Sequence, residues 1–173
     1  ICICLFIMLF DHISLGGGVI GFNSTELIVN KIIENKNNIN RDFYFAIIDK
    51  NLKNLEGGIA YSSELSRFGY FNNPIRLSPS KFIDFVKTNK FRSELLTYIN
   101  KDGGYVDKIW RDKNYSILKN FNKNKELFNE LYLPRYSFGI WQKTRLLNLL
   151  RKVEKFNINK KKIKIKIIFI KGN

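Results

Sequence analysis

The segment from residue 12 to residue 49 constrains the fold of this chain more than any other part of the sequence. A short apolar run, HISL, leads directly into a glycine cluster in which Gly16, Gly18 and Gly21 fit the spacing G-x-G-x-x-G. Further along, the run FYFAIID has no polar residue before its last, Asp49, which is typical of a strand buried on both faces of a parallel sheet. This order predicts a strand, a glycine turn, a helix, a loop and a second strand.

A helix is predicted between the two strands, from Ile20 to about Glu34. Ile20, Leu27, Ile28 and Ile32 recur with helical spacing, which would place them on one apolar face. The polar stretch NKNNINRD then ends the helix. A strand, a helix and a strand in this order form the context in which a glycine motif indicates dinucleotide binding.

The three motif glycines would each serve a different purpose in such a unit. Gly16 permits the tight turn, Gly18 lets the backbone approach a pyrophosphate, and Gly21 lets the helix pack against the sheet. The first N–H groups of the helix are unpaired and would hold the phosphates. Asp49 would accept hydrogen bonds from the adenosine ribose, although it lies 28 positions after Gly21 where roughly 20 is typical. The alternative is that the glycines form only a turn and Asp49 only caps a strand.

The composition permits a globular domain and excludes several other classes of protein. The 173 residues suffice for one domain with a sizeable core, and 45% of them are hydrophobic. Cys2, Cys4 and the single histidine, His12, are too few for a metal site, so no metal is expected, and we expect His12 to cap the first strand or to face solvent. The lack of a disulfide framework indicates a cytoplasmic protein. The apolar start of the chain is shorter than the roughly 20 residues that span a bilayer, so no membrane partner is expected.

The net charge of +15 raises the question of a phosphate-bearing partner. Lysine, asparagine and isoleucine are abundant along the whole chain, as an AT-rich coding sequence would produce, and this disfavours nucleic-acid binding. The best candidate for such a surface is the segment from Lys160 to Lys166, where lysine and isoleucine alternate. In a strand this alternation places lysines on one face and isoleucines on the other, which is also how a half-solvated strand looks.

Two helices and a strand are predicted further along the chain. Ser78 or Ser80 is expected to cap a helix with Pro79 near its start, and another helix is expected over residues 141–156. The residues expected on the apolar faces are Phe82, Ile83, Phe85 and Val86 in the first helix and Leu146, Leu147, Leu150 and Val153 in the second. Residues 161–170 are expected to form a strand. Residues 100–125 are polar, and no element is predicted there.

Several short motifs follow one another along the chain. They are GGGVIG (16–21), Asp49, GGIAYS (57–62), FNNPIRLS (71–78), KFIDFV (81–86) and LPRYSFG (133–139). Their order resembles that of FAD/NAD(P)-binding flavoproteins of the flavin-dependent hydroxylase-like type, over about residues 12 to 170. The family pattern contains G-x-G-x-A-Y-S, L-N-x-P-x-x-x-M-S and P-R-x-x-[YF]-G. This chain departs from it where Glu56 replaces the first glycine of G-x-G and Leu77 replaces the methionine before Ser78.

The resemblance implies an α/β fold, namely a Rossmann-like FAD/NAD(P)-binding domain with a parallel sheet that is incomplete at the C-terminus. Residues 12–173 would be the N-terminal part of that domain. Residues 1–11 would be an apolar leader, either native or foreign to the protein. The implied activity is that of an FAD-dependent oxidoreductase or monooxygenase-like enzyme, with NADH or NADPH as reductant and a small molecule as substrate. No catalytic residue is nominated because a flavin carries the redox chemistry itself, and the fragment alone is expected to be inactive.

The resemblance also assigns cofactor-binding residues. Those that would bind FAD are Gly16, Gly17, Gly18 and Gly21 at the pyrophosphate, Asp49 at the ribose, and Tyr61, Ser62, Asn73 and Arg76 near the flavin. In the segment PRYSFG, Arg135 would meet a phosphate or a carboxylate, or it would only shape the start of a helix together with Pro134 and Gly139. The competing hypothesis is a basic protein that binds nucleic acid, or an interaction protein without a cofactor.

Overall fold

The chain divides into two units, which are described separately. The structure is a computed structural model, and the residues it describes are 9–56, 58, 60–61, 69–160 and 163–172. We call Ile1–Leu55 with Arg145–Asn173 the sheet unit, and Glu56–Thr144 the helical unit. Ser62, one of the expected flavin contacts, lies outside the described residues.

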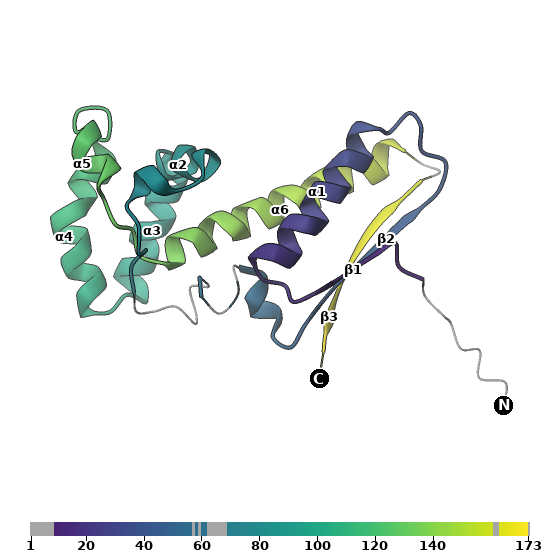
Figure 1. Ribbon diagram of the computed structural model, residues 1–173, viewed down its shortest axis with the longest axis horizontal. Coiled ribbons are helices and arrows are strands. Elements are labelled where there is room, and N and C mark those ends of the chain that lie inside the picture. Colours follow the sequence, from purple (N-terminus) through teal and green to yellow (C-terminus); the bar gives the residue numbers. More distant parts are fainter. Residues whose placement is uncertain (1–8, 57, 59, 62–68, 161–162, 173) are drawn as a thin grey trace. The chain divides into compact units, whose positions relative to one another are not determined.

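The sheet unit contains the predicted parallel sheet, which confirms an α/β architecture. Its strands are β1 (His12–Leu15), β2 (Phe43–Asp49) and β3 (Ile165–Lys171), in the order β1-β2-β3. Both pairings are parallel, with Ser14 opposite Ile47 and Ile47 opposite Phe169. The chain passes from β1 to β2 through α1 (Val19–Glu34), and a short 3₁₀ helix, η1 (Leu52–Glu56), follows β2. The predicted strand, glycine turn, helix and strand are therefore all present (Figure 1).

Helices α1 and α6 (Tyr136–Asn159) cover the same face of this sheet. A single buried cluster joins the two helices to the strands; its fully or almost fully buried members are Phe22, Val29, Phe45, Leu149, Val153, Phe156 and Ile165. Side chains alternate along a strand, so Phe43, Phe45 and Ile47 face these helices while Tyr44, Ala46 and Ile48 face the other side.

The buried face of α1 differs from the predicted one by a rotation of part of a turn about the helix axis. Ile20 is 86% exposed and Leu27 is 57% exposed, whereas Phe22, Thr25 and Val29 are buried. The glycine turn sets this rotation, because the start of the helix packs directly on the turn. Phe22 therefore faces the sheet, and so do Thr25 and Val29, which lie three and seven residues further along the helix. Ile28 and Ile32 are half-buried against the same cluster, as predicted.

The helical unit contains α2 (Ser80–Val86), α3 (Asn89–Lys101), α4 (Tyr105–Lys119), α5 (Lys125–Asn129) and the start of α6, after the short 3₁₀ helix η2 (Ile75–Leu77). Helix α4 occupies the polar stretch for which no element was predicted. Its buried side chains are only Asp107, Trp110 and Leu118, which is too sparse a pattern to indicate a helix from sequence.

Helix α2 confirms the predicted apolar face but not the predicted cap. Phe82 and Val86 are fully buried, and Ile83 and Phe85 are half-buried against the same core. The N-cap residue is Pro79, and no side chain caps the helix. Ser78 instead closes the preceding η2 turn through its own N–H, which donates to the Ile75 carbonyl at 2.8 Å.

Helix α6 begins five residues before the predicted start and ends three residues after the predicted end. Val153 is buried and Leu146 packs on the core of the sheet unit, as predicted. Leu147 is 43% exposed, and Leu149 and Phe156 take its place in the core. The final strand, β3, begins four residues after its predicted start and ends one residue after its predicted end.

No helix in the described part of the chain is long and apolar enough to cross a membrane.

Candidate functional site

The glycine turn between β1 and α1 is a close-packed structure that only glycine permits at two positions. Gly16 has a φ of +93°, a conformation that residues with a Cβ rarely adopt. Its N–H donates to the carbonyl of Ile48 at 2.7 Å, which ties the turn to the neighbouring strand. A Cβ on Gly21 would lie 2.0 Å from the Gly16 carbonyl oxygen. The first motif glycine is therefore favoured by its positive φ, and the third is required by a close contact within the turn.

Asp49 lies against the same turn, at the end of β2. Its Oδ2 accepts a hydrogen bond from the Gly17 N–H at 2.5 Å, and its Oδ1 accepts one from the Asn51 N–H at 2.9 Å. The residue is only 8% exposed. A Cβ on Gly17 would lie 2.7 Å from the side chain of Leu55, in the 3₁₀ helix that follows β2. The acidic residue and the glycine cluster thus lie together in the fold, although Asp49 follows Gly17 by 32 positions.

The N-terminus of α1 opens from this turn without a negative charge of its own. Gly18 is the N-cap residue, with φ −68° and ψ −167°, and no side chain caps the helix. The first turn of the helix contains no acidic residue. The first N–H groups of a helix lack intrahelical partners and carry partial positive charge. This arrangement is suited to binding an anion.

A polar network lies beneath the turn, between β1 and α1. The carbonyl of Gly21 lies within hydrogen-bond distance of three hydroxyl groups, those of Ser14 (3.1 Å), Ser24 (2.9 Å) and Thr25 (3.0 Å). His12 Nε2 lies 2.9 Å from Ser14 Oγ. His12 is half-buried and contacts this network, so the expectation that it only caps the strand or faces solvent is wrong. Side-chain alternation in β1 could have indicated this, because His12 and Ser14 share the face that α1 covers.

The remaining predicted site residues lie in the helical unit, where two of them meet. Tyr61 and Asn73 line a cavity of about 350 Å³. Arg76 does not line it; its Nε donates to Glu130 Oε1 at 2.6 Å on an exposed surface. Arg135 does line the cavity, and it also joins the start of α6 to residues 69–72.

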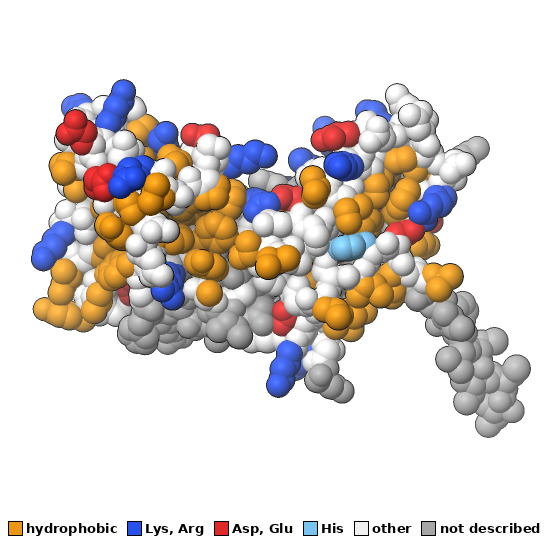
Figure 2. All heavy atoms as spheres, in the orientation of Figure 1, with side chains coloured by type: hydrophobic (Ala, Val, Ile, Leu, Met, Phe, Trp, Pro, Cys, Tyr) orange, Lys and Arg blue, Asp and Glu red, His pale blue; other side chains and the backbone are white. Residues whose placement is uncertain are grey.

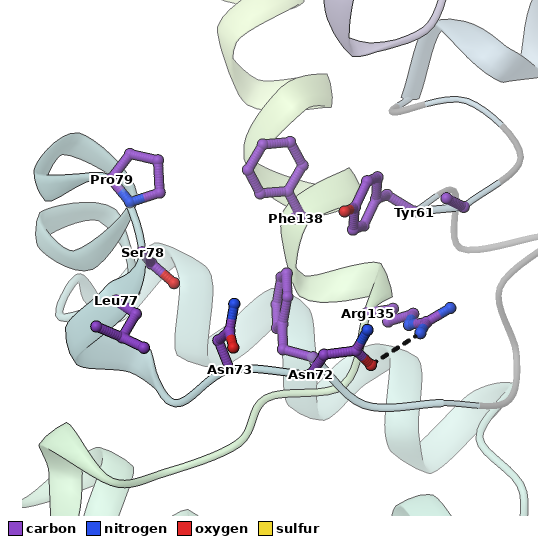
Figure 3. A pocket seen from close by; sticks show the side chains of 10 residues that line it. Tyr61, Asn72, Asn73, Leu77, Ser78, Pro79, Arg135 and Phe138 are labelled. Atoms are coloured by element: carbon purple, nitrogen blue, oxygen red, sulfur yellow. Dashed lines mark hydrogen bonds between the residues drawn. The ribbon is translucent and has the colours of Figure 1, made fainter.

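The cavity has aromatic walls and a polar rim (Figure 3). The ring of Tyr61 lies 5.0 Å from that of Phe138 and 6.1 Å from that of Phe71, measured between centroids. Arg135 donates from Nε to the Tyr70 carbonyl at 3.0 Å and from Nη2 to Asn72 Oδ1 at 3.2 Å. Phe71 and Phe138 were not among the predicted site residues. Both lie inside the motifs FNNPIRLS and PRYSFG, and this was the available signal.

A buried carboxylate lies elsewhere in the helical unit. Asp107 Oδ1 accepts a hydrogen bond from the Tyr136 hydroxyl at 3.0 Å, and Oδ2 accepts one from the Gly104 N–H at 3.0 Å. Burial, and then the Asp107 carboxylate, raise the pKa of Tyr136 far above its usual value. The same two causes raise the pKa of Tyr70. Because Asp107 caps α4 and Tyr136 begins α6, this network joins two helices, and it has a structural role.

The basic residues do not gather into one patch on the face drawn in Figure 2, where they are scattered among hydrophobic and acidic side chains. In the segment from Lys160 to Lys166, Lys164 and Lys166 are exposed and Ile165 is buried, as the alternation predicted. Lys166 lies over the ring of Tyr44, with Nζ 5.1 Å from its centroid. These lysines have the distribution of a half-solvated strand.

Comparisons with protein-family models, with curated proteins and with solved structures find no match to this chain.

Proposed function

We propose that the sheet unit binds the adenosine diphosphate part of FAD at the glycine turn, as the N-terminal part of an FAD-dependent oxidoreductase reduced by NAD(P)H. The observation that carries this proposal is the joint geometry of the turn and Asp49. Gly16 is favoured by its positive φ, Gly21 is required by its close approach to the Gly16 carbonyl, and the Asp49 carboxylate at the end of the neighbouring parallel strand contacts the same turn.

The topology of the sheet supports this proposal. The order β1-β2-β3 is that of one half of a doubly wound dinucleotide-binding sheet, whose full order is 3-2-1-4-5-6. Ligands of such folds bind outside the carboxyl ends of the strands. The glycine turn follows the carboxyl end of β1, and Asp49 ends β2.

The residues present fit a pyrophosphate and a ribose in different ways. The uncapped N-terminus of α1, with no acid in its first turn, would hold the phosphates. The Gly17 N–H is already used by Asp49, so its contribution is to position that carboxylate. Asp49 would accept hydrogen bonds from the ribose hydroxyls. When bound, the flavin supplies hydride and oxygen chemistry, and the protein supplies binding, orientation and electrostatics.

The experiment is to measure binding of FAD, ADP and FMN to the full chain by titration calorimetry. A site for the pyrophosphate and adenosine binds FAD and ADP but not FMN, which lacks both. The test variant is Gly18→Glu. Any residue can adopt the extended backbone of Gly18, so the substitution adds no backbone strain while it brings a carboxylate to the N–H groups of α1. The expected loss in affinity is about tenfold or more, because the added charge opposes the phosphates at close range.

The matched control is Leu27→Glu, which adds the same charge to the same helix at an exposed position outside the turn. It should bind FAD and ADP like the parent chain. Equal binding by the Gly18→Glu variant, or no binding of FAD and ADP by the parent, would contradict the proposal. The second of these results favours the interaction protein without a cofactor.

A further inference from the structure

The cavity in the helical unit combines one cation with aromatic walls. At about 350 Å³ it lies at the lower end of the range of ligand pockets, roughly 300–1,000 Å³. Its described lining residues include Arg135 and no aspartate or glutamate. The polar groups around Arg135 are neutral, namely the amides of Asn72 and Asn73 and the hydroxyl of Ser78. Among the described residues that line the cavity, the only charged side chain is therefore that of Arg135.

The guanidinium of Arg135 is held in place by uncharged groups. It has five N–H donors, of which two are used, by the Tyr70 carbonyl and by Asn72 Oδ1. No ion pair of Arg135 occurs within the described residues. Because the planar guanidinium is bound along one edge, its other N–H groups can donate to a second partner. Guanidinium groups bind carboxylates through two parallel hydrogen bonds.

The walls of the cavity favour a flat ligand. Tyr61, Phe71 and Phe138 bring their ring centroids within 5.0–6.4 Å of one another. Figure 3 shows the Tyr61 ring and the Arg135 side chain on one side of the cavity, and Ser78 and Pro79 on the other. Aromatic rings pair with further rings in stacked or edge-to-face arrangements. A ligand with one aromatic ring and one acid group could pack its ring against these side chains and pair its acid group with Arg135.

We infer that this cavity is a second ligand site, for a small aromatic carboxylate whose acid group pairs with Arg135 and whose ring packs against Tyr61 and Phe138. The inference does not rest on the proposed dinucleotide site. All the residues that carry it belong to the helical unit.

The test compares four probes on the full chain by ligand-observed NMR. Benzoate combines the ring with the carboxylate. Benzamide keeps the ring without the charge, cyclohexanecarboxylate keeps the charge without the aromatic ring, and phenyl phosphate changes the acid group. Benzoate is expected to bind about tenfold more tightly than benzamide because of the charge-assisted pair, and more tightly than the other two probes. Equal binding of benzoate and benzamide, selective binding of phenyl phosphate, or no binding of benzoate overturns the inference.

The position of the bound ligand is read from the indole N–H signals of the two tryptophans. Trp141 lies 5.0 Å from Phe138 between ring centroids, and its signal should move on addition of benzoate. Trp110 donates to the Tyr132 carbonyl at 2.8 Å, does not line the cavity, and should not respond. A response of Trp110 alone would place the ligand elsewhere and overturn the assignment.

The variant is Arg135→Gln, and its matched control is Arg76→Gln. The control removes the same charge from an arginine of the same unit that does not line the cavity. Arg135→Gln should weaken benzoate binding about tenfold, and Arg76→Gln should leave it unchanged. If Arg135→Gln fails to fold, Phe138→Leu takes its place; it keeps an apolar side chain and should abolish the preference for benzoate over cyclohexanecarboxylate.

Two further binding measurements distinguish this site from the dinucleotide site. Benzoate should bind the Gly18→Glu variant as it binds the parent chain, whether or not the parent binds FAD. FAD should not displace benzoate. Displacement by FAD would mean that the cavity is part of a flavin site and would overturn the assignment of a separate ligand.

Discussion

The sheet unit and the helical unit are stabilised by different features of the sequence. The sheet unit is distinguished by its backbone geometry: beside its buried cluster it has a parallel ladder, a turn with glycine at a φ of +93°, and a helix that starts against that turn. The helical unit is distinguished by its aromatic packing, since Phe82, Phe138 and Trp141 form a cluster with ring centroids 5.0–5.4 Å apart. Adding an atom at the glycine turn and removing atoms from the aromatic cluster therefore test the feature that is most distinctive of each unit.

The largest effect is expected for Phe82→Ala. This side chain is fully buried and contacts three other rings, so its loss leaves a cavity that the neighbours cannot fill. The free energy of unfolding should fall by about 3–5 kcal/mol. Urea unfolding followed by tryptophan fluorescence measures it, because both tryptophans lie in the helical unit. Leu77→Ala, at a position 58% exposed in the same unit, is the control and should change little.

Adding atoms to the sheet unit gives the converse test. Gly21→Val places a Cβ against the Gly16 carbonyl oxygen, at 2.0 Å before relaxation, so α1 or the turn must move. The expected cost is about 2–3 kcal/mol, seen as faster hydrogen exchange of the amides in β1 and β2. Gly18→Ala is the control, because its extended backbone accepts any residue. Unchanged exchange in the Gly21 variant would show that the turn does not need this glycine.

A substitution beside the buried carboxylate of the helical unit tests whether polar contacts also stabilise that unit. Tyr136→Phe removes the hydroxyl that donates to Asp107, which is only 6% exposed. Stability at pH 7 should fall by about 1–3 kcal/mol, measured by urea unfolding, with the exposed Tyr105→Phe as control.

The same tyrosine predicts a pH dependence. The folded chain raises the pKa of Tyr136, so this group adds to the free energy of unfolding at pH values below its unfolded pKa of about 10. The contribution is lost as the pH rises above that value, because the unfolded chain then releases the proton. The Tyr136→Phe variant should lose this part of the alkaline dependence. An identical alkaline profile in parent and variant would contradict the role assigned to the hydroxyl.

A smaller effect is expected at the start of α3. The Thr88 hydroxyl accepts a hydrogen bond from the Phe91 N–H at 3.2 Å and caps the helix. Thr88→Ala should reduce stability by about 1 kcal/mol, as measured by urea unfolding. Thr97→Ala, an exposed position within the same helix, should be neutral or stabilising because alanine is the better helix former.

The smallest effect belongs to an ion pair beside β1. Burial acts to raise the pKa of Asp11, but hydrogen bonds from the Tyr44 N–H and the Arg41 side chain outweigh it and lower the pKa. Because the pKa is lowered, Asp11 adds to the free energy of unfolding at pH values above its unfolded pKa of about 3.8, and this contribution is lost as the pH falls below it. Asp11→Asn should cost about 0.2–1 kcal/mol at pH 7 and nothing at pH 2. A difference from the parent chain that persists at pH 2 would have another origin.

The two units also differ in how much of each could be predicted. The strands, the glycine turn and the presence of α1 follow from local patterns, because alternation and glycine spacing reflect the backbone directly. The buried face of α1 does not, since Ile20 and Leu27 have the right spacing but lie on the solvent side. In the helical unit, α4 has no apolar stripe of its own, and it is stabilised by Trp110 and Leu118 packing into a core supplied by other segments.

The sequence by itself determined the parallel strand, glycine turn, helix and strand, and the place of Asp49 at the end of β2. These depend on residues whose effects are local. Only the tertiary structure decided the rotation of α1, the contact of Asp49 with Gly17, and the gathering of Tyr61, Asn73 and Arg135 around one cavity while Arg76 pairs with Glu130 outside it. The reason is that these contacts bring together residues 12 to 74 positions apart, and packing of the whole unit, not the preference of any segment, selects which of them meet.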